Sequence, residues 1–129
     1  MNYVLDTHCL IWYFIGSRRL KLKAMKAIDR CRLTGGKLLI PTIVLSECLD
    51  IAEKGKVEFD FNKMYQLIKN DPSFETISFT AEIFDETVRI KGIQEIHDRI
   101  ISATARFYGA DIITKDRLIM ESGEVEFFE

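Results

Sequence analysis

Four acidic residues of this 129-residue chain lie beside apolar segments, where an unpartnered carboxylate is costly. Asp6 and Asp116 each follow a short apolar run, and Glu47 and Asp98 lie beside the apolar stripes of two amphipathic segments. Carboxylate oxygens suit hard cations such as Mg²⁺ and Mn²⁺. A cation held by carboxylates, with positions open to a phosphate, can ionise water and neutralise charge on a phosphodiester. The four acids therefore indicate metal-dependent hydrolysis of a phosphate ester, with nucleic acid as the obvious polymer.

Residues 96–109 place one of these acids most clearly. Ile101, Ala105 and Tyr108 recur at helical spacing, and the final glycine of the segment is well placed to end a helix. Asp98 lies three residues before Ile101, which puts its carboxylate at the start of the buried stripe. The alternative is an acid at a helix start that is satisfied by backbone N–H groups and by the helix dipole.

The rest of the chain alternates between strands and helices. We expect strands at residues 3–5, 37–40, 74–77, 111–114 and 125–128. We expect helices at 8–14, from about 20 to a break at 34–36, 42–53 with Thr42 as its N-cap, 59–70, 80–92, 96–109 and around 118–120. The strands are short and apolar on both faces, which favours an α/β sandwich with a mostly parallel sheet.

The same alternation predicts that the four acids lie together. In parallel sheets, ligands bind beyond the carboxyl ends of the strands, at the point where the strand order reverses. Asp6 and Asp116 follow strands and share that edge, and Asp98 begins a helix that must run back along the sheet to reach the next strand. Glu47, one to two turns into its helix, can point to the same place. Four convergent carboxylates stay ionised only with a counter-charge, whereas any one of them alone could be a capping or loop residue.

Composition limits the class of protein. The chain is 47% apolar and its length suits one domain, residues 1–129. The net charge of −2 excludes a generally basic nucleic-acid binder. Residues 17–37, however, contain eight Lys and Arg residues and a single acid, Asp29. This basic segment is either a solvated helix face or a surface that faces phosphates.

The sequence also indicates the compartment. No apolar run approaches the ~20 residues of a membrane span, and no basic segment precedes the first apolar run, so we expect neither a membrane helix nor a signal peptide. The three cysteines are an odd number without paired spacing. We therefore expect reduced thiols in a cytoplasmic protein and no zinc site.

At the four acids the chain resembles the PIN-domain ribonucleases of the VapC toxin type. Four motifs carry the resemblance, in family order and over nearly the whole chain: residues 5–8 with 10–12, 40–42 with 45–47, 97–105, and 113–116. The third motif is the most specific. The resemblance implies a three-layer sandwich with a central, mostly parallel five-stranded sheet flanked by helices. It also implies an acidic site for Mg²⁺ or Mn²⁺, endoribonuclease activity on RNA, inhibition by a cognate antitoxin, and a homodimer.

Carried over residue by residue, the resemblance implies a catalytic and metal-binding set of Asp6, Glu47, Asp98 and Asp116. Asp6 and Asp98 match the direct metal ligands, and the other two acids match positions that act directly or through water. Thr7 and Thr114 match hydroxyl positions that support the site by hydrogen bonds.

Several neighbouring residues keep two interpretations. Arg99 either reaches phosphate or forms a structural ion pair, and Lys115 either touches RNA or is solvated. His8 and His97 flank two of the acids and are either general bases or supporting residues. Many relatives carry an Asp-Pro pair before the third motif, where this chain has residues 95–96, Glu-Ile. That difference concerns the turn into the helix rather than a ligand.

The leading interpretation is an endoribonuclease toxin in which metal-activated water attacks phosphorus and leaves 5′-phosphate and 3′-hydroxyl ends. The first alternative is a catalytically inactive PIN-fold module that binds RNA or a protein through the basic segment. The second is a phospho-receiver domain, which needs an adjacent acid pair after the first strand, where this chain has Asp6 and Thr7. Residues 20–64 are rich in amphipathic helices that could hold a helix of the antitoxin in a groove.

Overall fold

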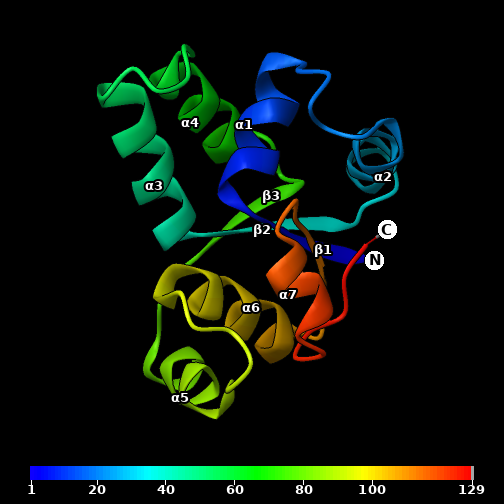
Figure 1. Ribbon diagram of the computed structural model, residues 1–129. Helices are drawn as coiled ribbons and strands as arrows, with labels where there is room; N and C mark the ends of the chain where they lie inside the picture. Colours follow the sequence, from blue (N-terminus) through cyan, green and yellow to red (C-terminus); the bar gives the residue numbers. More distant parts are fainter. Residues whose placement is uncertain (129) are drawn as a thin grey trace.

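In the part of the chain that the structure describes, four short parallel strands form the centre of the molecule (Figure 1). A computed structural model describes residues 1–128, apart from the side chains at positions 117 and 118. The strands are β1 (Asn2–Leu5), β2 (Lys37–Pro41), β3 (Phe74–Ile77) and β4 (Asp111–Ile113). Their order in the sheet is β3-β2-β1-β4, and each neighbouring pair is parallel. The order reverses at β1, so the edge beyond β1 and β4 is where a parallel sheet offers a ligand site.

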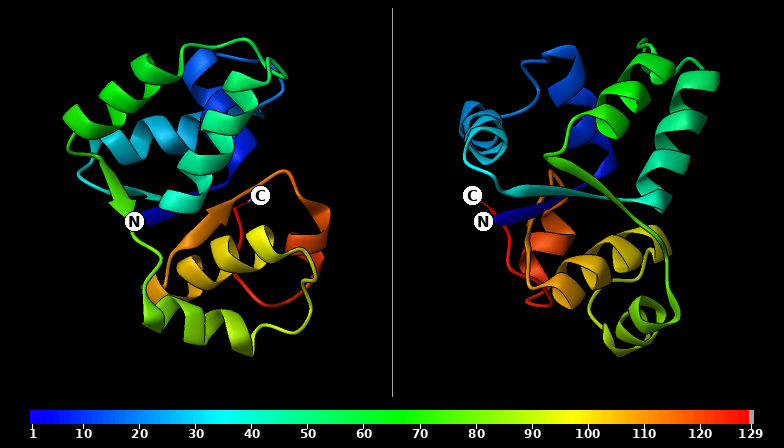
Figure 2. Two further views of the ribbon diagram at one scale, coloured as in Figure 1. Left: turned by 90° about the vertical axis from the view of Figure 1, so that its left-hand side faces the viewer. Right: turned by 180° about the vertical axis from the view of Figure 1, so that it is seen from behind.

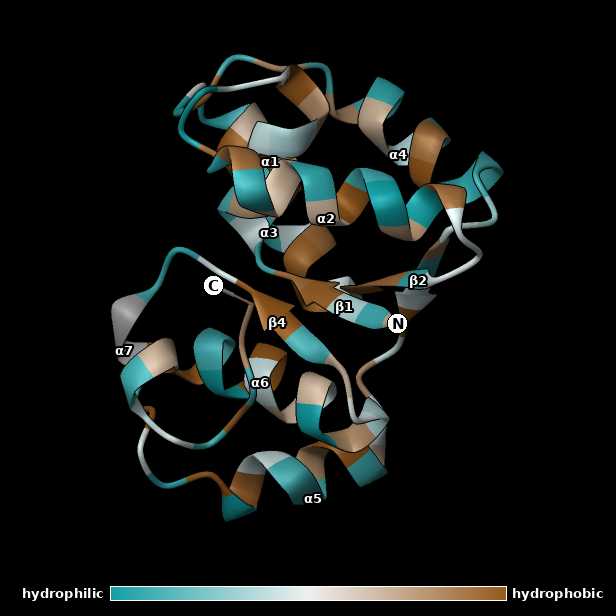
Figure 3. Cartoon of the chain, turned by 90° about the vertical axis from the view of Figure 1, so that its right-hand side faces the viewer, coloured by the Kyte–Doolittle hydropathy of each residue, from teal (hydrophilic) through white to brown (hydrophobic). Residues whose placement is uncertain are grey.

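Burial on both faces explains why β1, β2 and β4 are strands, whereas the two middle residues of β3, at the edge of the sheet, are exposed. Val4, Leu39, Ile40 and Ile112 are at most 2% exposed. Figure 3 shows the hydrophobic colouring of β1 and β4 between the two groups of helices. A strand covered on both faces needs a continuous apolar run rather than alternation.

Within residues 1–128, seven helices lie in two layers on the two faces of the sheet (Figures 1 and 2). One layer contains α1 (Thr7–Ile15), α2 (Leu22–Leu33), α3 (Thr42–Glu53) and α4 (Phe61–Asn70). The other contains α5 (Ala81–Arg89), α6 (Ile96–Tyr108) and α7 (Arg117–Glu121). The predicted α/β class, a parallel sheet flanked by helices, is therefore confirmed. In residues 1–128, no helix has the length and apolar character that a membrane span requires.

Two helices that begin at the carboxyl edge of the sheet have well-defined ends. The Asp6 side chain caps the start of α1, and α1 ends at Gly16 with φ 67°. The Glu95 side chain caps α6, which ends at Gly109 with φ 61°. Glycine adopts this left-handed conformation without the steric cost of a Cβ, which explains why both helices stop there. The predicted capping role of Thr42 is wrong, because α3 is preceded by Pro41 and has no side-chain cap.

The predicted fifth strand at residues 125–128 is also wrong. In residues 1–128 this segment contributes only an isolated parallel bridge, between Ile112 and Phe127. Just before it, the Glu124 carboxylate accepts hydrogen bonds from the backbone N–H groups of Lys91 (2.7 Å) and Gly92 (3.0 Å). This anchor holds the segment to the loop between α5 and α6, and only a short stretch remains to run beside β4. The described sheet has four strands.

Candidate active site

The four acids predicted from the sequence line one pocket of about 210 Å³ at the carboxyl edge of the sheet. They come from four separate places: the end of β1, α3, the first turn of α6, and the segment after β4. The pocket lies where β1 and β4 are neighbours, which is the point of reversal in strand order. The topology therefore brings together residues that are far apart in the sequence.

Asp6 is the most tightly held of the four acids and is only 7% exposed. Its Oδ1 accepts a hydrogen bond from the Cys9 backbone N–H at 2.9 Å. Its Oδ2 accepts hydrogen bonds from the Lys115 backbone N–H at 3.2 Å and from the Thr114 hydroxyl. The Thr114 oxygen in turn accepts from the Asp116 backbone N–H at 2.9 Å. Asp6 therefore caps α1 and also ties it to the segment that follows β4.

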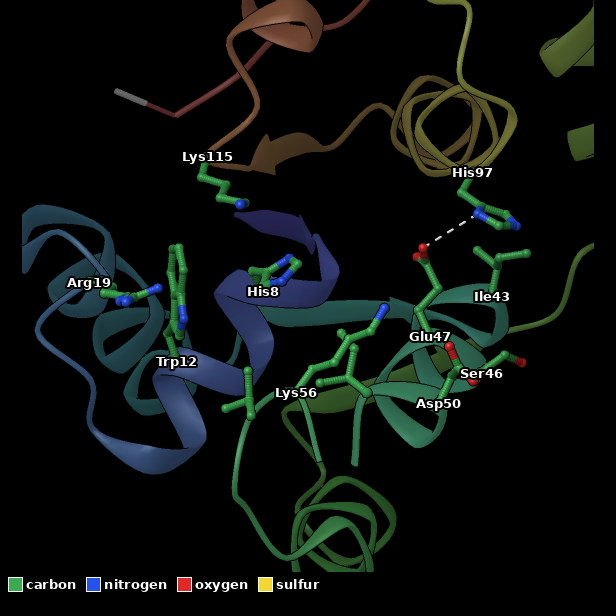
Figure 4. Close-up of a pocket in the computed structure, with 12 residues that line it drawn as sticks. His8, Trp12, Arg19, Ile43, Ser46, Glu47, Asp50, Lys56, His97 and Lys115 are labelled. Atoms are coloured by element: carbon green, nitrogen blue, oxygen red, sulfur yellow. Dashed lines mark ion pairs between the residues drawn. The ribbon is translucent and has the colours of Figure 1, made fainter. Parts of the chain in front are cut away.

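Glu47 is held from two other helices. Its Oε1 accepts a hydrogen bond from the Thr7 hydroxyl at 2.7 Å, and its Oε2 lies 3.4 Å from Nδ1 of His97 (Figure 4). The same His97 nitrogen lies 3.5 Å from Oε2 of Glu95. The carboxylate of Glu47 is thus oriented by α1 and α6 although it stands on α3.

Asp98 is the acid with the clearest electrostatic signature. Burial raises its pKa to about 7, with further contributions from a hydrogen bond to Asp116, from the charge of Asp116, and from Glu95 and Asp6. A hydrogen bond between two carboxyl groups needs a proton on one of them. The cap of α6 is supplied instead by Glu95, whose Oε1 accepts from the Asp98 backbone N–H at 2.9 Å. The charge of Asp98 is therefore not used to satisfy the helix start.

The donor chemistry of the pocket fits a hard divalent cation. Four carboxyl groups face one small space, and one of them keeps a proton near neutral pH. Asp6 uses three of its roughly four acceptor positions, so an oxygen lone pair remains for a cation. The side chains of residues 1–128 nevertheless contain no group of three or more His, Cys, Asp or Glu arranged to hold a metal ion. The residue types fit Mg²⁺ or Mn²⁺, but the described arrangement is not a formed coordination shell.

The two candidate substrate cations have different positions. Lys115 is exposed at the acidic pocket, and its Nζ lies 5.6 Å from the centre of the Trp12 ring. Arg99 does not line that pocket: its Nη2 donates to the carbonyl oxygens of Thr87 (3.0 Å) and Ile90 (2.9 Å). This guanidinium stabilises the carboxyl end of α5, where free carbonyls favour a positive charge.

His8 lies in the acidic pocket and has an electrostatic environment that favours the neutral ring. Burial lowers its pKa, the charge of Lys115 lowers it further, and the charges of Asp6 and Glu47 partly oppose this change. Its ring centre lies 5.7 Å from that of Trp12.

A second and wider pocket of about 630 Å³ adjoins the acidic one (Figure 4). Of its cations, Lys115 was a candidate RNA contact and Arg19 belongs to the basic segment predicted from the sequence, whereas Lys56 was not identified. Arg19 and Lys56 line it together with Lys115. The signal for Lys56 was weak: it follows Gly55, which lies just beyond the end of α3, a helix that starts at the acidic edge. The directions in which the chain leaves α1 toward Arg19 and α3 toward Lys56 depend on how these two helices pack.

Comparison with known proteins supports the family. A family model described as the PIN domain matches residues 3–121. No curated protein matches the chain. The solved structures that resemble it include VapBC2 from Rickettsia felis bound to a promoter DNA fragment, with a TM-score of 0.77, 16% identity, and coverage of 99% of this chain and 98% of that one.

Two further structures show the same fold. A toxin-antitoxin complex from Klebsiella pneumoniae has a TM-score of 0.62 and 22% identity, covering 88% of this chain and 86% of that one. VapC20 of Mycobacterium tuberculosis, described as a sarcin-ricin loop cleaving toxin, has a TM-score of 0.68 and 16% identity, covering 98% and 99%. Since the family model spans nearly the whole chain and the acids line one pocket at the switch point of the sheet, the chain belongs to the PIN domain family.

Proposed function

We propose that the protein is a metal-dependent endoribonuclease and the toxin of a toxin–antitoxin pair. Its catalytic and metal-binding residues would be Asp6, Glu47, Asp98 and Asp116, with Mg²⁺ or Mn²⁺ as the cofactor. The observation that carries the proposal is the shared pocket of four acids, in which burial and Asp116 raise the pKa of Asp98 to about 7 and so favour a proton on its carboxyl group. Such a site is suited to exchanging that proton for a divalent cation.

The four acids would have different roles, because some of their side chains are fixed by hydrogen bonds and others are not. Asp6 is fixed by three hydrogen bonds and Glu47 by the Thr7 hydroxyl, so these two carboxylates are oriented before any substrate arrives. Burial and the neighbouring Asp116 raise the pKa of Asp98 to about 7, so a cation that enters would displace a proton from Asp98. When bound, the cation would lower the pKa of water and neutralise charge on the phosphate.

The proposed reaction is hydrolysis of an RNA phosphodiester. The water oxygen forms a bond to phosphorus, the bond from phosphorus to the 3′ oxygen breaks, and the 3′ oxygen receives a proton. The products carry a 5′-phosphate and a 3′-hydroxyl. The carboxylates supply no covalent intermediate in this scheme; they position the reactants and stabilise charge.

The relatives support this substrate class and an antitoxin partner. VapC20 is described as a toxin that cleaves the sarcin-ricin loop, and the Klebsiella pneumoniae structure is described as a toxin-antitoxin complex. We propose that this chain likewise has a cognate antitoxin and forms a homodimer.

A second candidate is an inactive PIN-fold module that binds RNA or a protein. One observation favours it: among residues 1–128 no three potential ligands are already arranged around a cation position. This candidate predicts neither a specific Mn²⁺ site nor metal-dependent cleavage.

Incubation of the purified protein with total small RNA in Mg²⁺, Mn²⁺ or EDTA tests the proposal. We expect discrete fragments with 5′-phosphate ends that require the metal and disappear with Asp98→Asn. Asp85→Asn is the matched control, because Asp85 is exposed on α5 and lines none of the pockets described above. Equal cleavage by the Asp98→Asn protein would refute the site, and absence of both cleavage and Mn²⁺ binding would favour the inactive module.

A further inference from the structure

Three cations around the wide pocket have no carboxylate partner among the described residues. Arg19, Lys56 and Lys115 are all exposed, and none forms a salt bridge or a side-chain hydrogen bond within residues 1–128. Elsewhere, Arg32 and Arg106 are each paired with a carboxylate. Unpaired cations that converge on a concavity are what an anionic ligand requires.

These cations surround the pocket from separate parts of the chain. Figure 4 shows Lys115, Arg19 and Lys56 on different sides of the space, with His8 between them. Arg19 follows α1, Lys56 follows α3, and Lys115 follows β4. The pocket volume of about 630 Å³ lies within the range of sites that hold ligands of nucleotide size.

The wide pocket is continuous with the acidic one. Both are lined by His8, Glu47, Ile51 and Lys115. Lys115 joins them, since its backbone N–H donates to Asp6 while its ammonium group lies over Trp12. An RNA strand whose scissile phosphate lies among the acids can therefore place a neighbouring nucleotide in the wide pocket.

We propose that Arg19, Lys56 and Lys115 bind the backbone phosphates of single-stranded RNA next to the cleaved bond. This inference rests on the proposed ribonuclease function and names the substrate form for the same site. An unpaired strand can turn its backbone into a pocket, whereas a duplex presents a stiff surface. The three cations also explain how a protein with a net charge of −2 holds an anionic polymer close to four acids.

The basic face of α2 is a different surface. Lys23, Lys26 and Arg30 are exposed on this helix, and none lines either pocket. Figure 3 shows hydrophilic positions of α2 in teal, alternating with hydrophobic ones. These residues provide a control set that matches the proposed site, since both sets contain one Arg and two Lys.

The experiment measures RNA binding without cleavage. A fluorescein-labelled, single-stranded RNA of about 12 nucleotides and mixed sequence is titrated in EDTA, and anisotropy gives the affinity between about 50 and 200 mM salt. The triple variant Arg19→Gln, Lys56→Gln, Lys115→Gln is compared with Lys23→Gln, Lys26→Gln, Arg30→Gln.

Each phosphate contact on a single strand contributes about 0.7 to the slope of log affinity against log salt. We therefore expect the pocket triple to lose about 2 from the slope and at least about tenfold in affinity at low salt. The α2 triple should lose less than about 0.7 from the slope. All six side chains are exposed, so both triple variants should melt at the temperature of the parent protein. Lys56→Gln alone should reduce the slope of log affinity against log salt by about 0.7.

Two results would overturn the inference. Equal losses in the two triples would mean that RNA senses only net charge, and no loss in the pocket triple would leave its cations to another anionic partner, such as an acidic protein segment. The proposed activity is tested separately. If the parent protein binds RNA through the pocket but cuts nothing in Mn²⁺, the proposed nuclease activity is refuted. If the pocket triple variant binds and cuts RNA normally, only the proposed phosphate-binding role of the three cations is refuted.

Discussion

Mn²⁺ affinity should depend on pH because of one carboxyl group. The pKa of Asp98 is raised to about 7, chiefly by burial and by Asp116, from an ordinary value of 3.8. A cation that binds the ionised carboxylates must displace the proton that Asp98 holds below its pKa. We therefore expect Mn²⁺ to bind weakly in mild acid and tightly above neutrality.

The magnitude follows from the ionised fraction of Asp98. With a pKa of about 7, this fraction is about 3% at pH 5.5 and about 76% at pH 7.5. The Mn²⁺ dissociation constant should therefore fall about 25-fold over these two pH units. An aspartate with the ordinary pKa of 3.8 is almost fully ionised at both values and would leave the affinity nearly constant.

Isothermal titration calorimetry in buffers of different ionisation enthalpy measures both the affinity and the protons released. About 0.9 proton per Mn²⁺ should appear at pH 6 and about 0.1 at pH 8. Asp98→Asn should abolish this release and Asp85→Asn should not. His97 lies 3.4 Å from Glu47, so His97→Gln is a second control, and this variant should retain the proton release that comes from Asp98.

Without metal, the same pKa predicts a loss of stability as pH rises. The folded protein binds this proton more tightly than the unfolded chain, so the stabilisation is complete below about pH 4 and disappears as pH passes about 7. The metal-free melting temperature should be lower at pH 8 than at pH 5.5, unless Mn²⁺ is added. An Mn²⁺ affinity that changes less than about threefold between pH 5.5 and 7.5, with no proton release, would refute this account of Asp98.

Three further predictions concern packing and support of the site. A Cβ at Gly36 would lie 2.4 Å from the Met1 carbonyl oxygen and 2.7 Å from Cys31 Sγ, whereas one at Gly92 meets nothing closer than 3.5 Å. Chemical denaturation should therefore show Gly36→Ala destabilised by about 1–3 kcal/mol and Gly92→Ala nearly unchanged. Arg32 donates to Asp71 at 2.6 Å and to the Tyr13 hydroxyl at 2.9 Å, so Arg32→Met should cost about 1–2 kcal/mol, against less than about 0.5 for Lys54→Met in an exposed pair. Thr114→Val removes a hydrogen bond to Asp6, and calorimetry should find Mn²⁺ affinity at least about tenfold weaker; an unchanged affinity would show that this hydroxyl does not support the site.

The sequence predicted the two central strands well because each contains a run of apolar residues. Residues 3–5 and 37–40 lie in observed strands, since burial on both faces leaves little ambiguity in such runs. Residues 74–77 also form a strand, although only Phe74 and Ile77 of this edge strand are buried. The segment at 125–128 is equally apolar, but its pairing is limited by a contact that spans more than 30 residues, from Glu124 to the backbone of Lys91. No local pattern records that contact.

The location of the acidic pocket could be predicted from the sequence wherever it follows from the order of strands and helices. Acids that follow strands must lie at one edge of a parallel sheet, and Asp6 and Asp116 line the same pocket for that reason. Arg99 was harder, because its partners are carbonyl oxygens at the end of another helix rather than a phosphate or a carboxylate. The cations of the wide pocket, Arg19 and Lys56, stand in turns whose direction is set by tertiary packing.

Asp6 and Asp98 contribute differently to the stability of the fold, and this difference determines which variant is the cleaner test of the proposed site. Asp6 accepts three hydrogen bonds while nearly buried, so in Asp6→Asn an amide N–H would face the Lys115 N–H or the Cys9 N–H, at a cost of about 1–3 kcal/mol. In Asp98→Asn, by contrast, the new amide can donate to Asp116 without any proton, which removes the repulsion between the two carboxyl groups. Thermal melting without metal at pH 8 should therefore rank Asp98→Asn at or above the parent protein and Asp6→Asn below it. Loss of cleavage in Asp98→Asn then reports on chemistry, whereas loss in Asp6→Asn also reports on the start of α1.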